Sequence, residues 1–164
     1  MNLSRLISQA AAAGDRDAVS ELLDGDPTLI SSYAQDGCTP LHVAAYNGHI
    51  AVAELLLARG ADVDVRTHNG LAETPLLKAV IGQHVDAVIL LLAHGADVNR
   101  ANDAGATPLH KAAVLGDPGI TRLLVAHGAN VHARNSGGQT PMVHALFNRH
   151  ADVVALLQGH AGDE

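Results

Sequence analysis

The chain of 164 residues has almost no aromatic side chains: Tyr33, Tyr46 and Phe147 are present, and tryptophan is absent. Hydrophobic residues nevertheless make up 48% of the sequence, so the interior must consist mainly of Ala, Leu, Val and Ile. Small side chains of this kind suit thin layers of helices that approach each other closely. The composition therefore favours packed helices over one thick central core.

Cysteines, basic residues and long apolar runs are also scarce. A single cysteine, Cys38, excludes a disulfide framework and is typical of a reducing compartment. The formal net charge of −7 argues against nucleic acid or an anionic membrane as partner, because both attract basic surfaces. The longest apolar run, residues 87–93, is much shorter than a membrane span, and the N-terminus is a poor signal peptide. We therefore expect a soluble, cytoplasmic protein.

What the sequence does contain is an internal repeat. The dipeptide Thr-Pro recurs at intervals of 35, 33 and 33 residues, beginning at Thr39, Thr74, Thr107 and Thr140. A Gly-Ala pair follows each of the first three threonines after 21 residues, at Gly60, Gly95 and Gly128. Two markers that keep the same phase indicate a stacked array rather than a single globule.

Each repeat carries the signals for a turn, two helices and an extended arm. In the first complete repeat, Asp36-Gly37 predicts a hairpin turn, and Thr39-Pro40 predicts the start of a helix over residues 41–46. A second helix over 49–59 ends at Gly60, which supplies a left-handed cap. Because one such repeat cannot cover its own apolar face, neighbouring repeats must stack.

These motifs closely resemble the signature of ankyrin repeats. The resemblance rests on Thr39-Pro40-Leu41-His42, on Thr107-Pro108-Leu109-His110, and on Gly-Ala-Asp/Asn-Val at 60–63, 95–98 and 128–131. It covers residues 4–158 and implies an all-α solenoid of about five helix-turn-helix units with short β-hairpin fingers. It also implies a non-enzymatic scaffold that binds a partner protein on a concave groove.

The expected organisation is a single ankyrin repeat domain over residues 1–164. Its predicted parts are an N-terminal cap repeat at about 4–35, full repeats at 36–68, 69–102 and 103–136, and a C-terminal cap repeat at 137–160. The last repeat has Met142 and Val143 in place of Leu-His, Arg149 in place of glycine, and an acidic tail. Since terminal repeats must present a polar outer face, both ends are interpreted as caps.

The eleven histidines follow the repeat and do not form a site. His42 and His110 share one position, where the imidazole is expected to bond the backbone of the turn. Equivalent residues in adjacent repeats lie roughly 8–10 Å apart. This spacing is too wide for a shared zinc ion, whose nitrogen ligands lie about 2.1 Å from the metal. We expect neither a metal nor a cofactor.

Cys38 stands four residues before His42 at the start of a helix, an arrangement that could activate a thiol. Its position is variable, however, since Glu73, Ala106 and Gln139 occupy it in the other repeats. No third group that could orient the pair recurs beside it, and no phosphate-binding loop or carboxylate pair stands out. Cys38 is interpreted as an incidental thiol, and no enzymatic activity is expected.

In the ankyrin family, partners usually dock on the hairpin tips and on the exposed side of each first helix. An apolar column runs through that side, namely Tyr46, Ile81, Val114 and Phe147. Exposed aromatic and aliphatic side chains are typical of binding surfaces. The alternative is that these side chains pack between neighbouring helices and only look exposed.

The hairpin fingers supply the other candidates. The 35-residue interval is due to two extra residues, Leu71-Ala72, which enlarge the finger from His68 to Glu73 and could carry specificity or be tolerated drift. Arg66, Arg100 and Arg134 line the hairpin arms. They could steer an acidic segment of a partner or simply offset nearby aspartates.

The predicted function is binding of another protein, with the chain itself monomeric. The predicted contact residues are Tyr33, Tyr46, Asn47, Arg66, His68, Leu71, Glu73, Ile81, Val114, Leu115, Phe147 and Asn148. One alternative is a structural module that associates with its own copy. The other is a thiol- or metal-dependent enzyme that uses Cys38 or the histidines.

Overall fold

The structure, a computed structural model, describes residues 2–160, which form α-helices joined by turns and contain no β-strand. The chain divides into two compact units, Met1–Ala96 and Asp97–Glu164. The division falls within the predicted repeat 69–102. The acidic tail assigned to the C-terminal cap lies outside the described residues.

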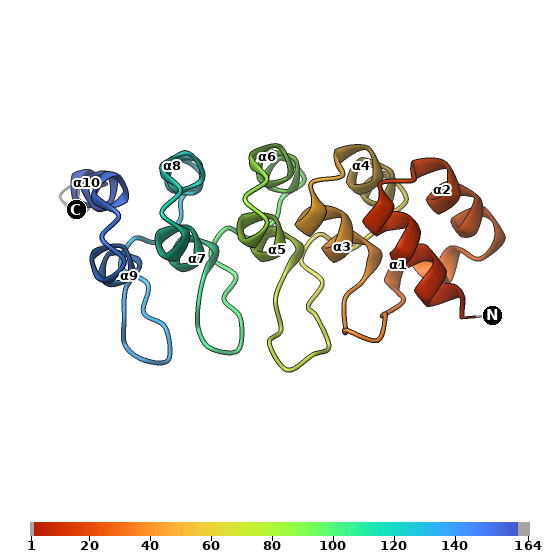
Figure 1. Cartoon of the computed structure of the whole chain (residues 1–164), viewed down its shortest axis with the longest axis horizontal. Helices are drawn as coiled ribbons and strands as arrows, with labels where there is room; N and C mark the ends of the chain where they lie inside the picture. The colour runs from red at the N-terminus through yellow and green to blue at the C-terminus, as the bar shows by residue number, and fades with distance from the viewer. Residues whose placement is uncertain (1, 161–164) are drawn as a thin grey trace. The chain divides into compact units, whose positions relative to one another are not determined.

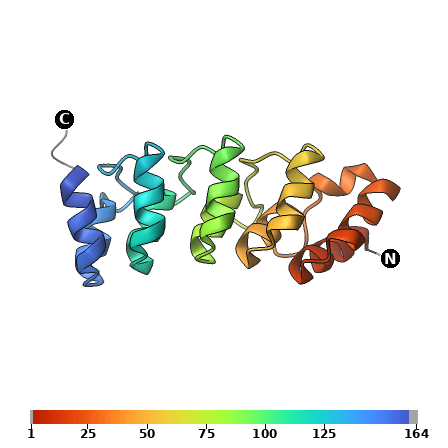
Figure 2. The same cartoon turned by 90° about the horizontal axis from the view of Figure 1, so that it is seen from above.

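The first unit consists of helix pairs in two layers. Its elements are α1 (Leu3–Ala13), α2 (Arg16–Gly25), the short 3₁₀ helix η1 (Pro27–Ser31), α3 (Pro40–Asn47), α4 (Ile50–Ala58), α5 (Pro75–Ile81) and α6 (Val85–Ala93). The inner helices α1, α3 and α5 lie side by side, and the outer helices α2, α4 and α6 form the second layer (Figures 1 and 2). Each pair therefore covers its apolar face against the next pair along the unit.

The second unit repeats this arrangement. Its elements are α7 (Pro108–Leu115), α8 (Pro118–Ala126), α9 (Pro141–Phe147) and α10 (Ala151–His160). The inner helices α7 and α9 pack together, as do the outer helices α8 and α10 (Figure 1). The predicted all-α solenoid repeats are confirmed.

Hairpin-like fingers connect the helix pairs, and each finger closes with few backbone bonds. In the finger before α3, the Ala34 N–H donates to the Cys38 carbonyl at 2.9 Å, and in the finger before α9 the Asn135 N–H donates to Gln139 at 3.0 Å. Such short pairings are turns rather than strands. The fingers expected from the sequence are present, but as turns.

The predicted helix signals act as expected. The Thr107 hydroxyl caps the N-terminus of α7, and Pro108 occupies its first turn. The inner helices α3 and α7 end at Gly48 and Gly116, both in the left-handed conformation with φ of 71°. Local sequence thus sets where each helix begins and ends.

The core of the described residues is built from aliphatic side chains, as the composition predicted. Its fully buried large residues are Ile7, Leu23, Leu41, Leu56, Leu76, Leu77, Leu91, Leu109, Ile120, Leu124 and Leu157, together with His42. No aromatic side chain within residues 2–160 is buried. No helix in the same range is long and apolar enough to cross a bilayer.

The sequence predicts a polar outer face for the C-terminal cap repeat, and this prediction is wrong for α9. Val143 and Leu146 are apolar, and their side chains are 42% and 56% exposed. One repeat earlier in the same unit, His110 and Ala113 hold these positions and are buried. The helix pair of α9 and α10 keeps the apolar stacking positions of its predecessor, and no helix within residues 2–160 covers them.

Two non-glycine residues adopt left-handed backbone at the end of an inner helix. Gln83 (φ 58°) and Arg149 (φ 62°) stand where Gly48 and Gly116 stand in the other repeats. A side chain in this conformation costs about 1 kcal/mol or more, because Cβ crowds the following carbonyl. The end of α9 is therefore strained relative to the end of α7.

Replacing Arg149 by glycine should relieve this strain. We expect Arg149→Gly to raise the free energy of unfolding by about 1 kcal/mol, which thermal unfolding followed by circular dichroism would detect. Arg149→Ala removes the same side chain but keeps a Cβ, so it should give little gain. Equal stabilisation by both variants would show that the backbone conformation is not the cause.

Candidate functional site

The inner face, defined in each unit as the surface of the inner helices and the fingers, carries most of the predicted contact residues. In the first unit, Tyr46 is 48% exposed at the end of α3, and Asn47 beside it is also exposed. Ile81 on α5 is half-buried. On the opposite side of α3, Ala44 and Ala45 are buried in the core. The helix thus separates a packed side from a side that faces solvent.

Two adjoining hollows open on this inner face. One, of about 530 Å³, lies between α1 and the first finger and is lined by residues that include Arg5, Tyr33 and Asp36. The other, of about 330 Å³, is lined by residues that include Tyr46, Asn47 and Lys78. Both hollows share Ala12, Asp36 and Val43. Together they provide recesses in which side chains of a bound protein could lie.

The first two fingers of this unit are held together. The rings of Tyr33 and His68 stack with centroids 3.7 Å apart and 13° between their planes. The His68 N–H donates to the Gly37 carbonyl at 2.8 Å. A Cβ on Gly37, whose φ is 73°, would lie 2.6 Å from the carbonyl carbon of His68, so only glycine fits. The structure thus brings two predicted contact residues together and half-buries Tyr33.

The enlarged finger presents Leu71 at its tip, where the side chain is half exposed. The Asn69 side-chain oxygen accepts hydrogen bonds from the Leu71 N–H at 3.1 Å and from the Thr67 hydroxyl at 2.8 Å. These bonds order the two-residue insertion. Arg66, farther up the same arm, is half-buried.

Glu73 does not lie on the exposed surface as the sequence suggested. Its side chain is 5% exposed, and its carboxylate lies 2.7 Å from Lys78 Nζ. Burial opposes the charged form of Lys78, but the carboxylate of Glu73 outweighs burial, and the pKa of Lys78 is raised. The Thr67 N–H donates to the Glu73 carbonyl at 2.9 Å, a closure of the finger that residue spacing alone does not reveal. Glu73 is therefore a structural partner of Lys78.

His42 has the backbone-bonding role expected from the sequence. Its Nδ1 accepts the Thr39 N–H at 3.2 Å, and its Nε2 donates to the Glu73 carbonyl at 2.9 Å, which joins one repeat to the next finger. Burial lowers the pKa of His42 from 6.5 to about 4, so the imidazole is neutral at pH 7.

His110 repeats this arrangement in the second unit. It accepts the Thr107 N–H at 3.2 Å and donates to the Gln139 carbonyl at 3.0 Å. Burial also lowers the pKa of His110, with a further contribution from the nearby His144. Both histidines connect a helix start to the next finger.

Cys38 is buried beside this network. Burial raises the pKa of its thiol from 9.0 to about 11, with only partial opposition from the charge of Lys78. A thiol with so high a pKa is a poor nucleophile at neutral pH. Within residues 2–160, no group of three or more His, Cys, Asp or Glu side chains is placed to hold a metal ion.

The inner face of the second unit is more apolar. Phe147 at the end of α9 is 84% exposed, and Val114 at the end of α7 is also exposed. Leu115 is half-buried, and Asn148 is exposed. The Asn148 side-chain amide donates to the His144 carbonyl at 2.8 Å, which fixes it against its own helix.

Sequence analysis missed one position of the inner face in every repeat. Val43, Lys78, Lys111 and His144 are half-buried and lie three residues before the apolar column. Residues three apart on a helix share a face, so the helical spacing could have identified them. Val43 extends the apolar surface, whereas Lys78, Lys111 and His144 add positively charged or polar groups beside it.

Two family models match the chain. A model described as ankyrin repeats in three copies matches residues 63–135 and 100–163, and one described as the ankyrin repeat matches residues 36–68. Together they cover the fingers and helix pairs from α3 onward. The matches coincide with the repeats observed in the structure.

Several curated proteins are similar over part of their length. A probable E3 ubiquitin-protein ligase of Oryza sativa subsp. japonica, XBOS31, is 39% identical over 82 residues, which is 49% of this chain and 18% of that protein. The serine/threonine-protein kinase VIK of Arabidopsis thaliana is 43% identical over 74 residues, 45% of this chain and 16% of the kinase. Human ankyrin repeat domain-containing protein 49 is 41% identical over 64 residues, 39% of this chain and 27% of that protein. The chain thus matches about a quarter or less of each of these relatives.

The pKa of His42 predicts a loss of stability in mild acid. Because the unfolded imidazole binds a proton near pH 6.5 and the folded one near pH 4, stability is fully present above pH 6.5 and falls as the pH drops toward 4. We expect His42 to account for roughly 2–3 kcal/mol of this loss between pH 7 and 4.5. Urea unfolding of wild type and His42→Leu at both pH values tests this, with Leu chosen because Leu77 occupies the position in the next repeat. An equal loss in both proteins would contradict the prediction.

The burial of Cys38 predicts a slow thiol. At pH 8 a pKa of about 11, in place of 9.0, leaves about a hundredfold less thiolate. Alkylation by iodoacetamide, followed by mass spectrometry, should therefore be at least about a hundredfold slower in the folded protein than in urea. Comparable rates in the two states would show that the thiol is accessible and activated.

Proposed function

The chain belongs to the ankyrin repeat family, and on this premise we propose that it binds another protein through the inner face of its repeats. Ankyrin repeats are generally protein–protein interaction modules, and the family is generally non-enzymatic. The proposal concerns which surface makes the contact and which residues carry it.

The observation that carries the proposal is the placement of the exposed aromatic residues. Tyr46 and Phe147 expose 48% and 84% of their side chains on the inner face, while no Phe, Tyr or Trp of the described residues is buried in the core. Large exposed aromatics cost free energy in water and are enriched among the residues that dominate binding. Their position at the ends of inner helices makes them natural anchors for a partner.

In the first unit the proposed contacts surround the two hollows. Tyr46, Asn47 and Ile81 come from the inner helices, and Tyr33, His68 and Leu71 come from the fingers, with Arg66 on the arm of the enlarged finger. The stacked Tyr33 and His68 rings restrain the fingers before binding, which reduces the entropy lost on association. Glu73 is left out because its carboxylate is already paired with Lys78.

In the second unit the proposed contacts are Val114, Leu115, Phe147 and Asn148. This surface is mainly apolar and carries Lys111 and His144 at its border. It suits an apolar segment of a partner more than a charged one.

The expected setting is the cytoplasm, with the chain free of cofactors. The one cysteine is buried and free, a state that a reducing compartment preserves. An enzymatic role for Cys38 is disfavoured by its raised pKa and its burial. Nucleic acid and anionic membrane are disfavoured as partners by the net charge of −7.

Capture of partners from a lysate of the source cells tests the inner face. Wild type, Tyr46→Arg and Phe147→Arg serve as baits, and bound proteins are identified by mass spectrometry. We expect a protein retained by wild type to be weakened at least about tenfold by one of the two substitutions, since each replaces an exposed anchor with a charge.

Ile89→Arg is the matched control, because Ile89 is 47% exposed on the outer helix α6. Circular dichroism establishes that all four baits are folded. Retention of the same proteins by every bait would refute the inner face as the binding surface. Loss caused by Ile89→Arg alone would move the site to the outer helices.

A further inference from the structure

The first helix pair of the first unit and the last helix pair of the second unit each carry a groove that has the character of a stacking surface. In the second unit, a groove of about 340 Å³ lies between α9 and α10. It is lined by Leu146, Arg149, Ala151, Val154, Ala155 and Gln158. Val143 lies three residues before Leu146 on α9, and both side chains are well exposed. None of the residues that line this groove belongs to the proposed contact residues of the inner face.

The molecule itself shows what covers such a groove. The residues 33 positions before Val143, Leu146 and Val154 are His110, Ala113 and Thr121, which are all buried. In that repeat the inner helix α7 packs against α9, and the outer helix α8 packs against α10. The surface that fits this groove is therefore the side of a similar helix pair that faces the preceding repeat, called here the leading side.

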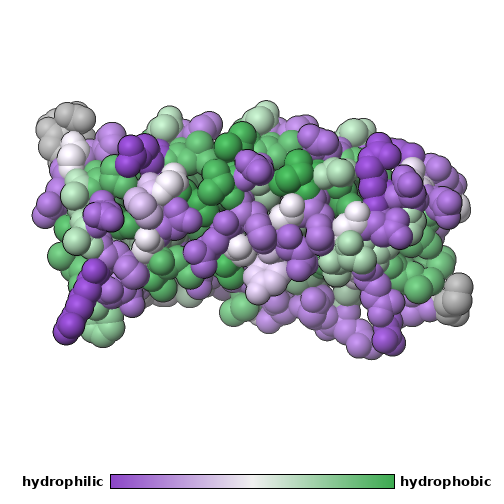
Figure 3. All heavy atoms as spheres, turned by 45° about the horizontal axis from the view of Figure 1, so that its top comes forward, coloured by the Kyte–Doolittle hydropathy of each residue, from purple (hydrophilic) through white to green (hydrophobic). Residues whose placement is uncertain are grey.

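The first repeat carries such a leading side. A groove of about 540 Å³ between α1 and α2 is lined by Leu6, Gln9, Ala10, Ala18, Glu21 and Leu22. Its four apolar members, Leu6, Ala10, Ala18 and Leu22, are half-buried. The residues 34 positions later, Pro40, Ala44, Val52 and Leu56, are buried in the second repeat. Figure 3 shows apolar surface near the N-terminal end of the chain.

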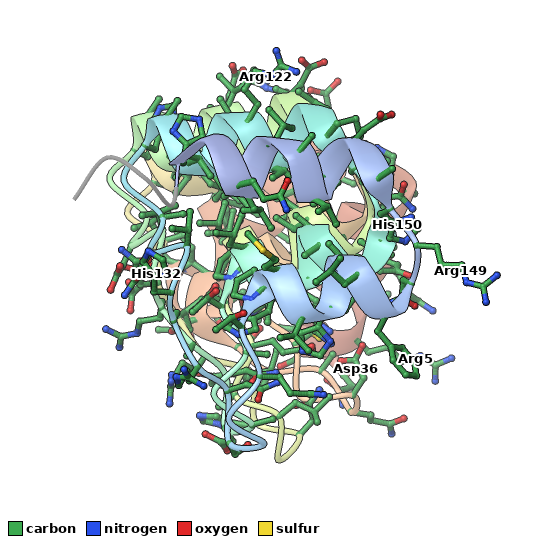
Figure 4. All side chains as sticks on the ribbon, turned by 90° about the vertical axis from the view of Figure 1, so that its left-hand side faces the viewer. Arg5, Asp36, Arg122, His132, Arg149 and His150 are labelled. Atoms are coloured by element: carbon green, nitrogen blue, oxygen red, sulfur yellow. The ribbon has the colours of Figure 1, made fainter. Side chains whose placement is uncertain are left out.

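Charge adds a specific pairing to these apolar faces. In the second unit, His150 donates through Nε2 to the Val114 carbonyl at 3.0 Å, and its ring lies over Gly116. One repeat after Gly116 stands Arg149, which projects outward at the edge of the C-terminal face in Figure 4. The first repeat has Asp15, and the fourth has Asp117, where the other repeats have His49, His84 and His150. A helix pair that stacked on α9 and α10 in the same register would bring the Asp15 carboxylate to the Arg149 guanidinium.

We propose that the chain self-associates head to tail, with the groove between α1 and α2 of one copy stacked on the groove between α9 and α10 of another. The occupant of each end face is thus a second copy of this chain. The contact joins two different surfaces, so association continues from copy to copy and is open-ended. This inference does not rest on the proposed function, because it uses the end faces and leaves the inner-face residues out. Self-association of this kind differs from the monomeric state that the sequence predicts.

Sedimentation velocity of the full chain tests the proposal. From about 1 µM to about 1 mM, the weight-average mass of wild type should rise steadily above that of the monomer, with no plateau at the dimer. A monomer mass throughout this range would overturn the proposal. So would a plateau at the dimer, which indicates a closed, symmetric contact.

Blocking one face at a time distinguishes a head-to-tail contact from other modes. Leu146→Glu places a charge in the C-terminal groove, and Ala18→Lys fills the N-terminal groove; neither residue is buried in the core. Each variant alone should be monomeric, because every head-to-tail contact needs both faces. Mixed in equal amounts, the two should form a one-to-one dimer and nothing larger, through the single intact pair of faces. Self-association of either variant alone would refute the head-to-tail contact.

Two milder substitutions test the charge pair without loss of folding. Asp15→Asn removes the charge but keeps a good N-cap for α2, where Asp15 accepts the Ala18 N–H at 3.0 Å. Arg149→Gly removes the guanidinium and relieves the strained backbone. Each should weaken association by roughly threefold to tenfold at low salt, although the second stabilises the fold. If neither Asp15→Asn nor Arg149→Gly changes the strength of association, the assigned register is wrong.

Tyr46→Arg is the control that separates this proposal from the inner-face proposal. It alters a side chain of α3 away from both end grooves and should leave the mass distribution of wild type unchanged. Loss of self-association in this variant would place the contact on the inner face and overturn the end-face assignment.

Discussion

The stacking of one helix pair on the next is the interaction on which the rest of this protein depends. A pair such as α3 and α4 has no core of its own, so its Ala, Val and Leu side chains are buried only against neighbouring pairs. Imidazoles reinforce the stacking. The buried His42 donates to the Glu73 carbonyl of the next finger at 2.9 Å, and the half-buried His49 donates to the Ala12 carbonyl of the preceding repeat at 2.9 Å. Since each bond joins one repeat to another, these bonds stabilise the stack and also fix the register in which neighbouring repeats pack.

This constraint also determines which surfaces are left for function. Close stacking requires small side chains between the helices, such as Ala44 and Ala45, and leaves no room there for a large ring. The aromatic residues Tyr46 and Phe147 are therefore exposed on the inner face, where they can act in binding. The same constraint makes an uncovered end face apolar, because a repeat that stacks on one neighbour is built to stack on another. Val143 and Leu146 on α9 are the clearest instance.

Much of the fold could be predicted because its signals are local. Thr-Pro caps, glycines at helix ends and the spacing of apolar residues each act within a few residues, and the structure has the helices at the predicted places. The backbone-bonding role of His42 was predictable for the same reason, as its position in the motif fixes its distance from Thr39. The site was predicted less well. The burial of Glu73 depends on its ion pair with Lys78 and on the closure of the enlarged finger, and the stack of Tyr33 on His68 joins residues of two repeats.

The sequence by itself determined the repeat, the helix boundaries, the aliphatic core and the column of residues that faces away from it. These follow from composition and from short-range geometry, in which residues three or four apart share a helix face. The tertiary structure alone decided which of those residues remain accessible, which fingers are tied together and which charges are paired. Accessibility depends on whether a neighbour lies over a face. Val143 and Leu146 are exposed because no helix within residues 2–160 packs over their side of α9, whereas their counterparts in α7 are buried where α7 packs against α9.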